Sequence, residues 1–418
     1  MTVSLGIDFG TSGARLVAID TDCNVIWWGA RDLVAGQWRQ VLFGLIQSVP
    51  IEIKSRVGRI AIDGTSSTVL LCDADGRLVG TPILYNDDRA KSVLEQLGSI
   101  APARHLVLNA TSSLAKLYWF ASQPDLIVGG ASPTENRAPY FLHQADWLAY
   151  HLHGKLGISD YHNALKLGYD VESLDYPSWL EQSPYRSLLP QVCKPGTPIG
   201  TVMSAVAQEL GLGADCLVCA GTTDSIAAFL ASGVETPGAA VTSLGSTLAI
   251  KLLSQTRVDD VDYGIYSHRL DDLWLVGGAS NTGGAVLRHF FSDLELVSLS
   301  QKIDPHAPSQ LDYYPLLTPG ERFPINDPDL LPRLAPRPDC QVDFLHGLLT
   351  GIAKIEARGY ELLTELGATP ITTVYTAGGG AQNQTWTRIR QRYSSVPISI
   401  SKHQEAAYGA ALLAQRGN

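Results

Sequence analysis

Residues 6–13 of this chain read Gly-Ile-Asp-Phe-Gly-Thr-Ser-Gly, and this stretch decides the fold. It follows alternating apolar residues and leads into Leu16-Val17-Ala18-Ile19, which predicts a strand, a tight glycine-rich turn and a second strand. Such a turn exposes backbone N–H groups that can hold phosphate oxygens, and the hydroxyls of Thr11 and Ser12 add donors. Asp8, at the end of the first strand, offers the hard oxygen ligands that Mg²⁺ prefers. Taken alone, the segment is also typical of an ordinary turn whose aspartate accepts turn amides.

A second hydroxyl-rich turn occurs in the other half of the chain. Residues 243–247 read Ser-Leu-Gly-Ser-Thr and stand between the apolar runs 239–242 and 248–250. Their hydrophobic–Gly–hydroxyl–hydroxyl pattern matches residues 9–12. A match of four positions is common by chance, so the repeat is weak evidence by itself. It suggests two halves of the chain, each offering a turn to one shared cleft.

Asp224 is the second acidic candidate. The apolar run 216–220 predicts a buried strand, and Asp224 follows it and opens a helix of small residues. A carboxylate at the positive N-terminal end of a helix stays ionised. Simple N-capping is the commoner reason for an aspartate at such a position.

Two glycine clusters, 277–284 and 378–380, lie between an expected strand and an expected helix. Each can bring backbone N–H groups to a ligand. Neither shows G-x-G-x-x-G together with the acidic residue of a dinucleotide site, which argues against Rossmann-type binding. Further on, residues 341–366 predict a long amphipathic helix. Ser401-x-x-Gln404 predicts a capping box for a final helix, whose Gly409 would let another backbone approach closely.

Composition and charge limit the class of protein. The chain has 418 residues, of which 45% are hydrophobic and 17% charged, and this favours a globular protein of two or three domains. Its net charge of −10 argues against nucleic acid and anionic membranes as partners, because both require clustered positive charge.

The remaining polar patterns are typical of structure rather than chemistry. The six cysteines read as reduced thiols, and Cys216-x-x-Cys219 lacks the further ligands of a zinc site. His151 and His153 are two positions apart in a helix-like stretch and point apart, which disfavours a shared metal. The first residues enter a strand directly, and no apolar run reaches ~18 residues. We therefore expect a soluble cytoplasmic protein, either a monomer or a homodimer.

Taken together, seven segments in order resemble the FGGY carbohydrate kinases across nearly the whole chain. Each is weak alone, but their shared order is specific and favours a functional interpretation of Asp8 and Asp224. The segments are residues 6–12 (first phosphate turn), 84–89 (similar to W-N-D-x-R), 144–154 (similar to D-Y-L…T-G), 221–224 (Gly-rich turn with the catalytic Asp), 243–247 (second phosphate turn), 320–324 (G-E-R-x-P) and 378–383 (adenosine motif).

The resemblance implies an α/β, two-domain, actin-like ATPase fold of the ribonuclease H-like type with an interdomain cleft. We place an N-terminal FGGY domain at 1–228, with the sugar site, the first phosphate turn and the catalytic Asp. A C-terminal FGGY domain at 229–418 would hold the nucleotide. This division puts Asp224 at the hinge of the cleft.

The resemblance also implies the roles of individual residues in phosphoryl transfer from ATP. Asp224 would be the general base, Asp8 would hold Mg²⁺ through water, and Thr11 would complete the catalytic set. Asp8, Asp224, Ser66 and Ser67 would bind the sugar. The residues implied to bind ATP are Gly10, Thr11, Ser12, Gly245, Ser246, Thr247, Gly284, Gly380 and Asn383.

The identity of the sugar depends on residues 64–67. Xylulose kinases carry Gly-Gln-Met-His there, whereas this chain has Gly-Thr-Ser-Ser. The chain resembles most the cyanobacterial and plant xylulose-kinase-like group, for which D-ribulose is the suggested substrate. We therefore expect transfer of the γ-phosphate to the terminal hydroxyl of a ketopentose, D-ribulose giving D-ribulose 5-phosphate. D-xylulose is the alternative substrate, and an actin- or chaperone-like nucleotide-binding switch is the alternative of a different class.

Overall fold

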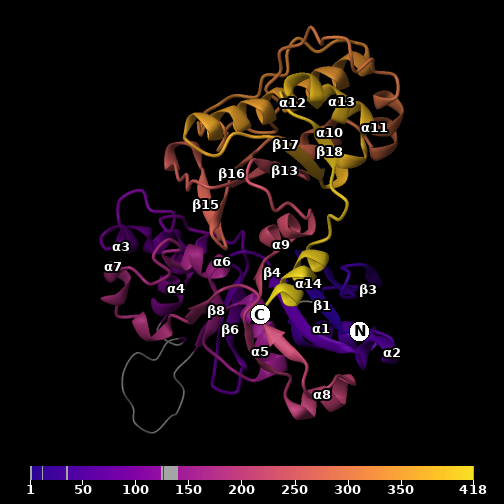
Figure 1. The fold of residues 1–418 in the computed structure, drawn as a ribbon. Helices are drawn as coiled ribbons and strands as arrows, with labels where there is room; N and C mark the ends of the chain where they lie inside the picture. Colours follow the sequence, from indigo (N-terminus) through magenta and orange to yellow (C-terminus); the bar gives the residue numbers. More distant parts are fainter. Residues whose placement is uncertain (1, 12, 34–35, 124–125, 127–139, 418) are drawn as a thin grey trace. The chain divides into compact units, whose positions relative to one another are not determined.

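The computed structural model describes residues 2–11, 13–33, 36–123, 126 and 140–417, and the chain divides into two compact units. The first unit contains Met1–Ala231 and Glu405–Asn418, and the second contains Ser232–Gln404. Each unit combines β-sheet with packed helices (Figure 1). The expected α/β fold with two domains is therefore confirmed.

A seven-stranded sheet forms the centre of the first unit. Its strands are β1 (Val3–Phe9), β2 (Gly13–Ile19), β3 (Val25–Asp32), β4 (Val57–Gly64), β10 (Pro198–Thr201), β11 (Leu217–Cys219) and β12 (Thr222–Thr223). The order is β10-β11-β4-β1-β2-β3, with β12 paired to β4. β1 is antiparallel to β2 and parallel to β4, so the expected opening hairpin is present. Every residue of β1 is buried, because neighbouring strands cover both of its edges and helix α14 packs on it.

Smaller elements complete the first unit. The other strands are β5 (Val69–Cys72), β6 (Leu78–Ile83), β7 (Tyr140–His143), β8 (Ile158–Asp160) and β9 (Gln191–Cys193). The helices are α1 (Trp38–Ser48), α2 (Ile51–Lys54), α3 (Leu94–Gly98), α4 (Ser113–Ala121), α5 (Gln144–His153), α6 (Tyr161–Ala164), α7 (Ser178–Glu181), α8 (Ser204–Leu210), α9 (Asp224–Ala231) and α14 (Ala406–Arg416).

The C-terminal helix α14 packs on β1 and α9 of the first unit (Figure 1). A Cβ atom at Gly6 would lie 2.0 Å from the Ala407 carbonyl oxygen, and one at Gly409 would lie 1.8 Å from that of Ala227. Glycine at both positions allows the close backbone approach that the sequence predicts. Residues 405–418, which the sequence-based division places in the domain 229–418, thus pack with the first unit.

The capping box expected at Ser401 and Gln404 is wrong. The helix begins at Ala406, and the Gln404 side chain accepts the N–H of Gly378 at 3.0 Å. The Ser401 hydroxyl donates to the carbonyl of His403 at 2.8 Å. A tertiary hydrogen bond has replaced the local one because Gly378 offers a backbone donor at this place.

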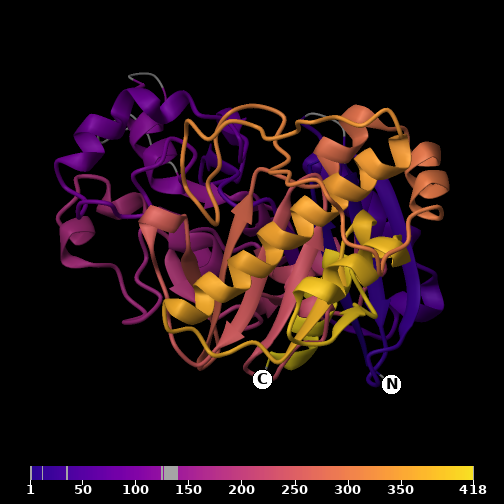
Figure 2. The same ribbon diagram turned by 90° about the horizontal axis from the view of Figure 1, so that it is seen from above.

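A six-stranded sheet forms the centre of the second unit, in the order β15-β16-β14-β13-β17-β18. Figure 2 shows the long helix α12 lying across this sheet. Its bounds, Gln341–Glu365, agree with the helix expected at 341–366. The other elements are β13 (Ala239–Leu244), β14 (Leu248–Ser254), β15 (Tyr266–Leu270), β16 (Leu273–Ser280), β17 (Thr373–Ala377), β18 (Ile398–Ile400), α10 (Gly284–Phe290), α11 (Asp293–Ser300) and α13 (Gln384–Tyr393).

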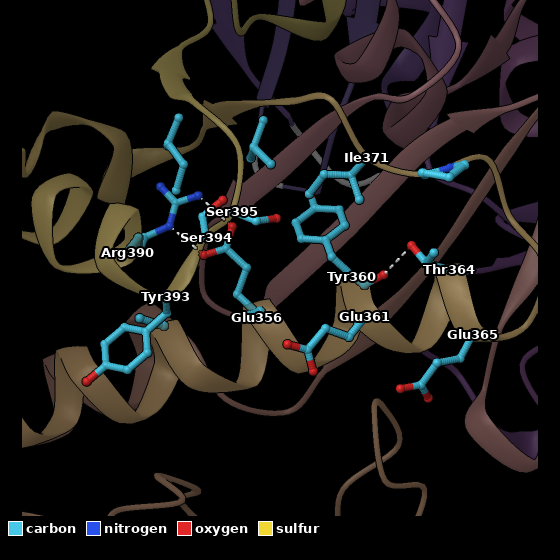
Figure 3. A pocket seen from close by; sticks show the side chains of 15 residues that line it. Glu356, Tyr360, Glu361, Thr364, Glu365, Ile371, Arg390, Tyr393, Ser394 and Ser395 are labelled. Atoms are coloured by element: carbon cyan, nitrogen blue, oxygen red, sulfur yellow. Dashed lines mark hydrogen bonds and ion pairs between the residues drawn. The ribbon is translucent and has the colours of Figure 1, made fainter.

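A buried ion pair connects α12 to α13 (Figure 3). Arg390 donates from Nε to Glu356 Oε2 at 2.5 Å and from Nη2 to Oε1 at 2.6 Å. The Thr242 hydroxyl of β13 also donates to Glu356, and the Arg390 side chain is 0% exposed. The pair and Tyr360 line a cavity of about 410 Å³ in the second unit. The polar network thus joins both helices to the sheet.

None of the helices in the described ranges is both long and apolar enough to cross a lipid bilayer. The six cysteines are free thiols. Burial raises the pKa of Cys72, Cys193 and Cys216 to about 12, so these thiols stay protonated at neutral pH.

His151 and His153 on α5 are neutral imidazoles. Burial lowers the pKa of both to about 4, and the His151 ring stands edge-on to Trp147 with centroids 4.3 Å apart. Because a histidine of the unfolded chain titrates near pH ~6.5, the unfolded chain binds more protons than the folded chain between pH ~6.5 and ~4. The stability contributed by these residues is complete above pH ~6.5 and is lost as the pH falls.

The free energy of unfolding falls when the pH is lowered from ~7.5 to ~4.5. Replacing His151 by phenylalanine is expected to make this fall smaller by about 1–2 kcal/mol. Phenylalanine retains the ring packing against Trp147 but cannot take up a proton. Urea unfolding at both pH values measures the effect, and at the higher pH the variant should match the wild type. An equal acid-induced loss in both proteins would contradict the prediction.

Candidate active site

Two carboxyl groups lie side by side where β1 and β4 end. Asp8 pairs with Asp63 in parallel register, and paired residues of adjacent strands point to the same face of a sheet. Asp8 is 5% exposed and Asp63 is 0% exposed. No N–H or hydroxyl group of the described residues donates to the carboxyl oxygens of Asp63, and their hydrogen-bonding neighbour is the carboxyl group of Asp8. Burial raises the pKa of Asp63 well above its ordinary range, and the charge of Asp8 raises it further.

Asp8 also lies within the field of Asp224 and Arg15. Burial raises the pKa of Asp8 and the charge of Asp224 raises it further, while a hydrogen bond with Asp63 and the charge of Arg15 oppose these effects. Arg15 Nη1 is 3.4 Å from Asp8 Oδ2, and Arg15 Nε is 3.4 Å from Glu405 Oε2. Because the guanidinium is half-exposed and shared with Glu405, it offsets only part of the negative charge at this place.

The sheet edge suits a divalent cation that arrives with a phosphate chain. Mg²⁺ is usually held by one or two carboxylates together with water and substrate phosphates. Within the part of the chain that the structure describes, no group of three or more His, Cys, Asp and Glu residues could hold a metal. The adjacent carboxyl groups of Asp8 and Asp63 therefore fit a cation bound with its substrate and not one held in a protein cage.

Asp224 is brought to the same sheet edge by β12. Thr222 and Thr223 pair with Asp63 and Gly64 of β4, and Asp224 follows as the first residue of α9. Its Oδ1 accepts the N–H of Ser225 at 2.7 Å. Since the helix begins at this half-buried carboxylate, the helix dipole favours its ionised form. The structure thus brings together Asp8 and Asp224, as the sequence predicts, and adds Asp63.

The first predicted phosphate turn closes through a hydrogen bond from Gly10 N–H to the Gly13 carbonyl at 3.1 Å. Thr11 is exposed within it, and Ser12 lies outside the described residues. The turn follows Asp8 directly. Its exposed threonine and partly exposed glycine are accessible to an incoming anion.

Ser66 and Ser67, the predicted sugar-binding residues, lie in a turn between β4 and β5. The turn closes through Thr68 N–H and the Thr65 carbonyl at 3.1 Å. Gln144 of α5 holds it from outside, accepting from the Thr65 N–H and hydroxyl at 3.1 Å each. Ser66 is half-buried and Ser67 is buried.

In the second unit, three predicted glycine-rich segments meet backbone to backbone. Gly284 N–H donates to the Gly245 carbonyl at 2.9 Å, and Ala285 N–H donates to the Ser246 carbonyl at 2.9 Å. A Cβ atom at Gly378 would lie 2.9 Å from the Leu244 carbonyl group, so a side chain does not fit there. Ser246 and Thr247 remain exposed at the turn, which leaves their hydroxyls available to a ligand.

A cavity of about 840 Å³ adjoins these segments. Gly284, Gly380 and Asn383, all predicted to bind the nucleotide, line it together with Leu296 and Val297 of α11. The Asn383 side chain donates to Ser300 Oγ at 2.9 Å and accepts the Trp386 N–H at 3.0 Å. Asn383 therefore also shapes the cavity by capping α13 and binding α11.

The sequence analysis missed three residues of these sites. Asp63 ends an apolar run just as Asp8 does, a signal that could have identified it. Arg288 lines the cavity and donates to Ser246 Oγ at 3.1 Å, and its place one turn after the glycine cluster was a signal. Glu321 of the G-E-R-x-P segment accepts the Ser280 hydroxyl at 2.5 Å and the Asn281 N–H at 2.7 Å. It fixes the turn that leads to Gly284.

Comparison with known proteins covers both units. Residues 3–231 match the N-terminal domain of the FGGY family of carbohydrate kinases, and residues 240–417 match its C-terminal domain. A xylulose kinase of Staphylococcus epidermidis is 24% identical over 99% of this chain and 88% of its own length. A gluconokinase of Bacillus subtilis is 20% identical over 98% of this chain and 86% of its own length.

A solved structure shares the fold. The crystal structure of a xyloylose kinase from Brucella ovis superimposes with a TM-score of 0.85 at 23% sequence identity, and it covers 100% of this chain and 91% of that one. The matches to both domains over almost the entire chain show that this protein belongs to the FGGY family of carbohydrate kinases, which are phosphotransferases.

Proposed function

We propose that this protein transfers the γ-phosphate of ATP to the terminal hydroxyl of D-ribulose, giving D-ribulose 5-phosphate. The observation that carries the proposal is the grouping of Asp8, Asp63 and Asp224 at one sheet edge of the first unit. Phosphoryl transfer requires a base, a cation and accurate positioning more than covalent chemistry. A sugar and ATP are the proposed partners of a monomer or homodimer.

Asp224 is the proposed general base, accepting the proton of the attacking sugar hydroxyl. Asp8 would hold Mg²⁺ beside the first phosphate turn. Bound Mg²⁺ would neutralise charge that develops on the transferred phosphoryl group. Thr11 and the other turn residues hold phosphate oxygens through N–H and hydroxyl donors. The residues proposed for ATP are Gly10, Thr11, Ser12, Gly245, Ser246, Thr247, Gly284, Gly380 and Asn383.

The preference for D-ribulose rests on the turn at residues 65–68. Ser66 and Ser67 place short hydroxyl side chains where the glutamine-containing segment of xylulose kinases has larger ones, which leaves room for a differently placed sugar hydroxyl. D-xylulose is the second candidate, because relatives such as the S. epidermidis protein are named xylulose kinase.

Release of ADP by the purified protein, measured with D-ribulose, D-xylulose, ribitol, arabitol, glycerol and no sugar, tests the proposal. We expect the fastest release with D-ribulose, and ³¹P NMR should identify a terminal phosphate monoester. Ribulose turnover no faster than the background without sugar would reject the ribulose assignment. ATP hydrolysis that no sugar stimulates would favour a nucleotide-binding switch instead.

A further inference from the structure

Lys116 on α4 is a buried lysine in the first unit. Its side chain is 0% exposed, and among the described residues no carboxylate forms an ion pair with it. Its ammonium donates to the carbonyl oxygens of Ser67 at 2.8 Å, Leu84 at 2.7 Å and Tyr85 at 3.3 Å. Three acceptors match the three N–H bonds of an ammonium group. Burial lowers the pKa of Lys116 to about 7, with Asp87 opposing the shift, so the position carries a desolvation cost.

The three acceptors belong to two segments that flank strands β5 and β6. One is the turn that carries Ser66 and Ser67, and the other follows β6 and leads to Asp87. A further hydrogen bond joins them, from Tyr85 N–H to Thr68 Oγ1 at 3.0 Å. Lys116 therefore fixes the position of the serine turn relative to the segment that resembles W-N-D-x-R.

Ser67 combines an unfavourable backbone conformation with a buried hydroxyl group that lacks a hydrogen bond within the described part of the chain. Its φ is +63°, in the left-handed region that residues with a side chain rarely occupy. It is 2% exposed, and its hydroxyl has no hydrogen-bond partner among the described residues. A strained backbone and an unsatisfied buried hydroxyl in one residue are typical of a site whose ligand completes the hydrogen bonds.

We propose that Lys116 is a positioning residue for the sugar and acts through Ser67. By binding the Ser67 carbonyl, the ammonium fixes the peptide unit and keeps the Ser67 hydroxyl oriented for a hydroxyl group of the substrate. The inference rests on the proposed sugar kinase activity and deepens it, because it names what holds the sugar-binding turn in place.

The test uses Lys116→Met, Ser67→Ala and the double variant, with the panel sugar that the wild type turns over fastest. Each single variant is expected to raise the sugar KM about tenfold, the loss of one hydrogen bond, while the KM for ATP stays within about twofold. If Lys116 acts through Ser67, the double variant should raise the sugar KM about tenfold as well. A double variant whose sugar KM rises about a hundredfold, the product of the two single effects, would overturn the proposal. An unchanged sugar KM in folded Lys116→Met would overturn it as well.

Matched variants separate positioning from stability. Phe120→Leu alters a fully buried residue of the same helix and should lower the melting temperature without changing the sugar KM. Lys116→Gln retains two N–H donors and should give a sugar KM between those of the wild type and Lys116→Met; it also serves if Lys116→Met does not fold. An increase in KM for Phe120→Leu equal to that of Lys116→Gln would reject the positioning role. A wild type that phosphorylates no sugar rejects the function and with it this role, whereas an active wild type with unaffected Lys116 variants rejects only the role.

Discussion

Replacing Asp224 by asparagine is expected to lower kcat for sugar phosphorylation by about 10²–10⁴-fold, the range that general-base catalysis contributes. Asparagine has nearly the same size and can still accept the Ser225 N–H, but its amide cannot take the proton of the sugar hydroxyl. The residue belongs to the first unit, whereas the cavity at Gly284 and Gly380 belongs to the second. The Kd for ATP, measured by calorimetry without sugar, is therefore expected to stay within about twofold.

Ser225→Ala is the control for this prediction. Ser225 is exposed and adjacent, and its backbone N–H, which binds Asp224, survives the substitution. The control should retain kcat within about threefold, since no group of the proposed chemistry is removed. An Asp224→Asn enzyme with more than a tenth of wild-type kcat would refute its role as the base. A parallel loss of ATP affinity would indicate a misfolded site and not a missing base.

Replacing Glu356 by alanine is expected to destabilise the second unit by about 3–5 kcal/mol, because it leaves the Arg390 guanidinium buried without its counter-ion. The Arg390 side chain is 0% exposed. It donates two hydrogen bonds to Glu356 and one, at 2.7 Å, to the Thr376 hydroxyl. Figure 3 shows the pair at the cavity between α12 and α13. Chemical denaturation measures the decrease in the free energy of unfolding, and hydrogen exchange in α12 and α13 shows whether it is located there.

The same helix provides the control. Arg358 of α12 binds Glu365 with an Nη1–Oε1 distance of 2.7 Å, but both side chains are about half exposed. Arg358→Ala should therefore cost less than about 1 kcal/mol. The double variant Glu356→Leu/Arg390→Met removes both buried charges and should be more stable than Glu356→Ala. Equal losses for Glu356→Ala and Arg358→Ala would show that burial of the ion pair does not decide its contribution.

Local sequence patterns predicted those parts of the protein whose contacts are local. The turn after Asp8, the helix at 341–366 and the strand before Asp224 depend on residues within a few positions of each other, and the structure has all three. Lys116 escaped notice because its acceptors lie 49, 32 and 31 residues away. No spacing rule reveals such contacts.

The same limit explains why the expected capping box is wrong. Gln404 has the right spacing for a capping box, yet its side-chain oxygen accepts a hydrogen bond from the Gly378 N–H on a different segment. Asp63 ends an apolar run as Asp8 does, but only the parallel register of β1 and β4 shows that the two carboxyl groups are neighbours. Pairing between distant strands decides the composition of the site, and sequence periodicity carries no information about it.

The return of the chain to the first unit has a consequence for biosynthesis. The first unit is interrupted after Ala231 and resumes only at Glu405. During synthesis, β1 with Gly6 therefore lacks its packing partner α14 until the whole second unit has been made. Domains usually fold in the order in which they leave the ribosome. Here the inserted unit has all its residues first, and the first unit becomes complete only after the whole second unit has been translated.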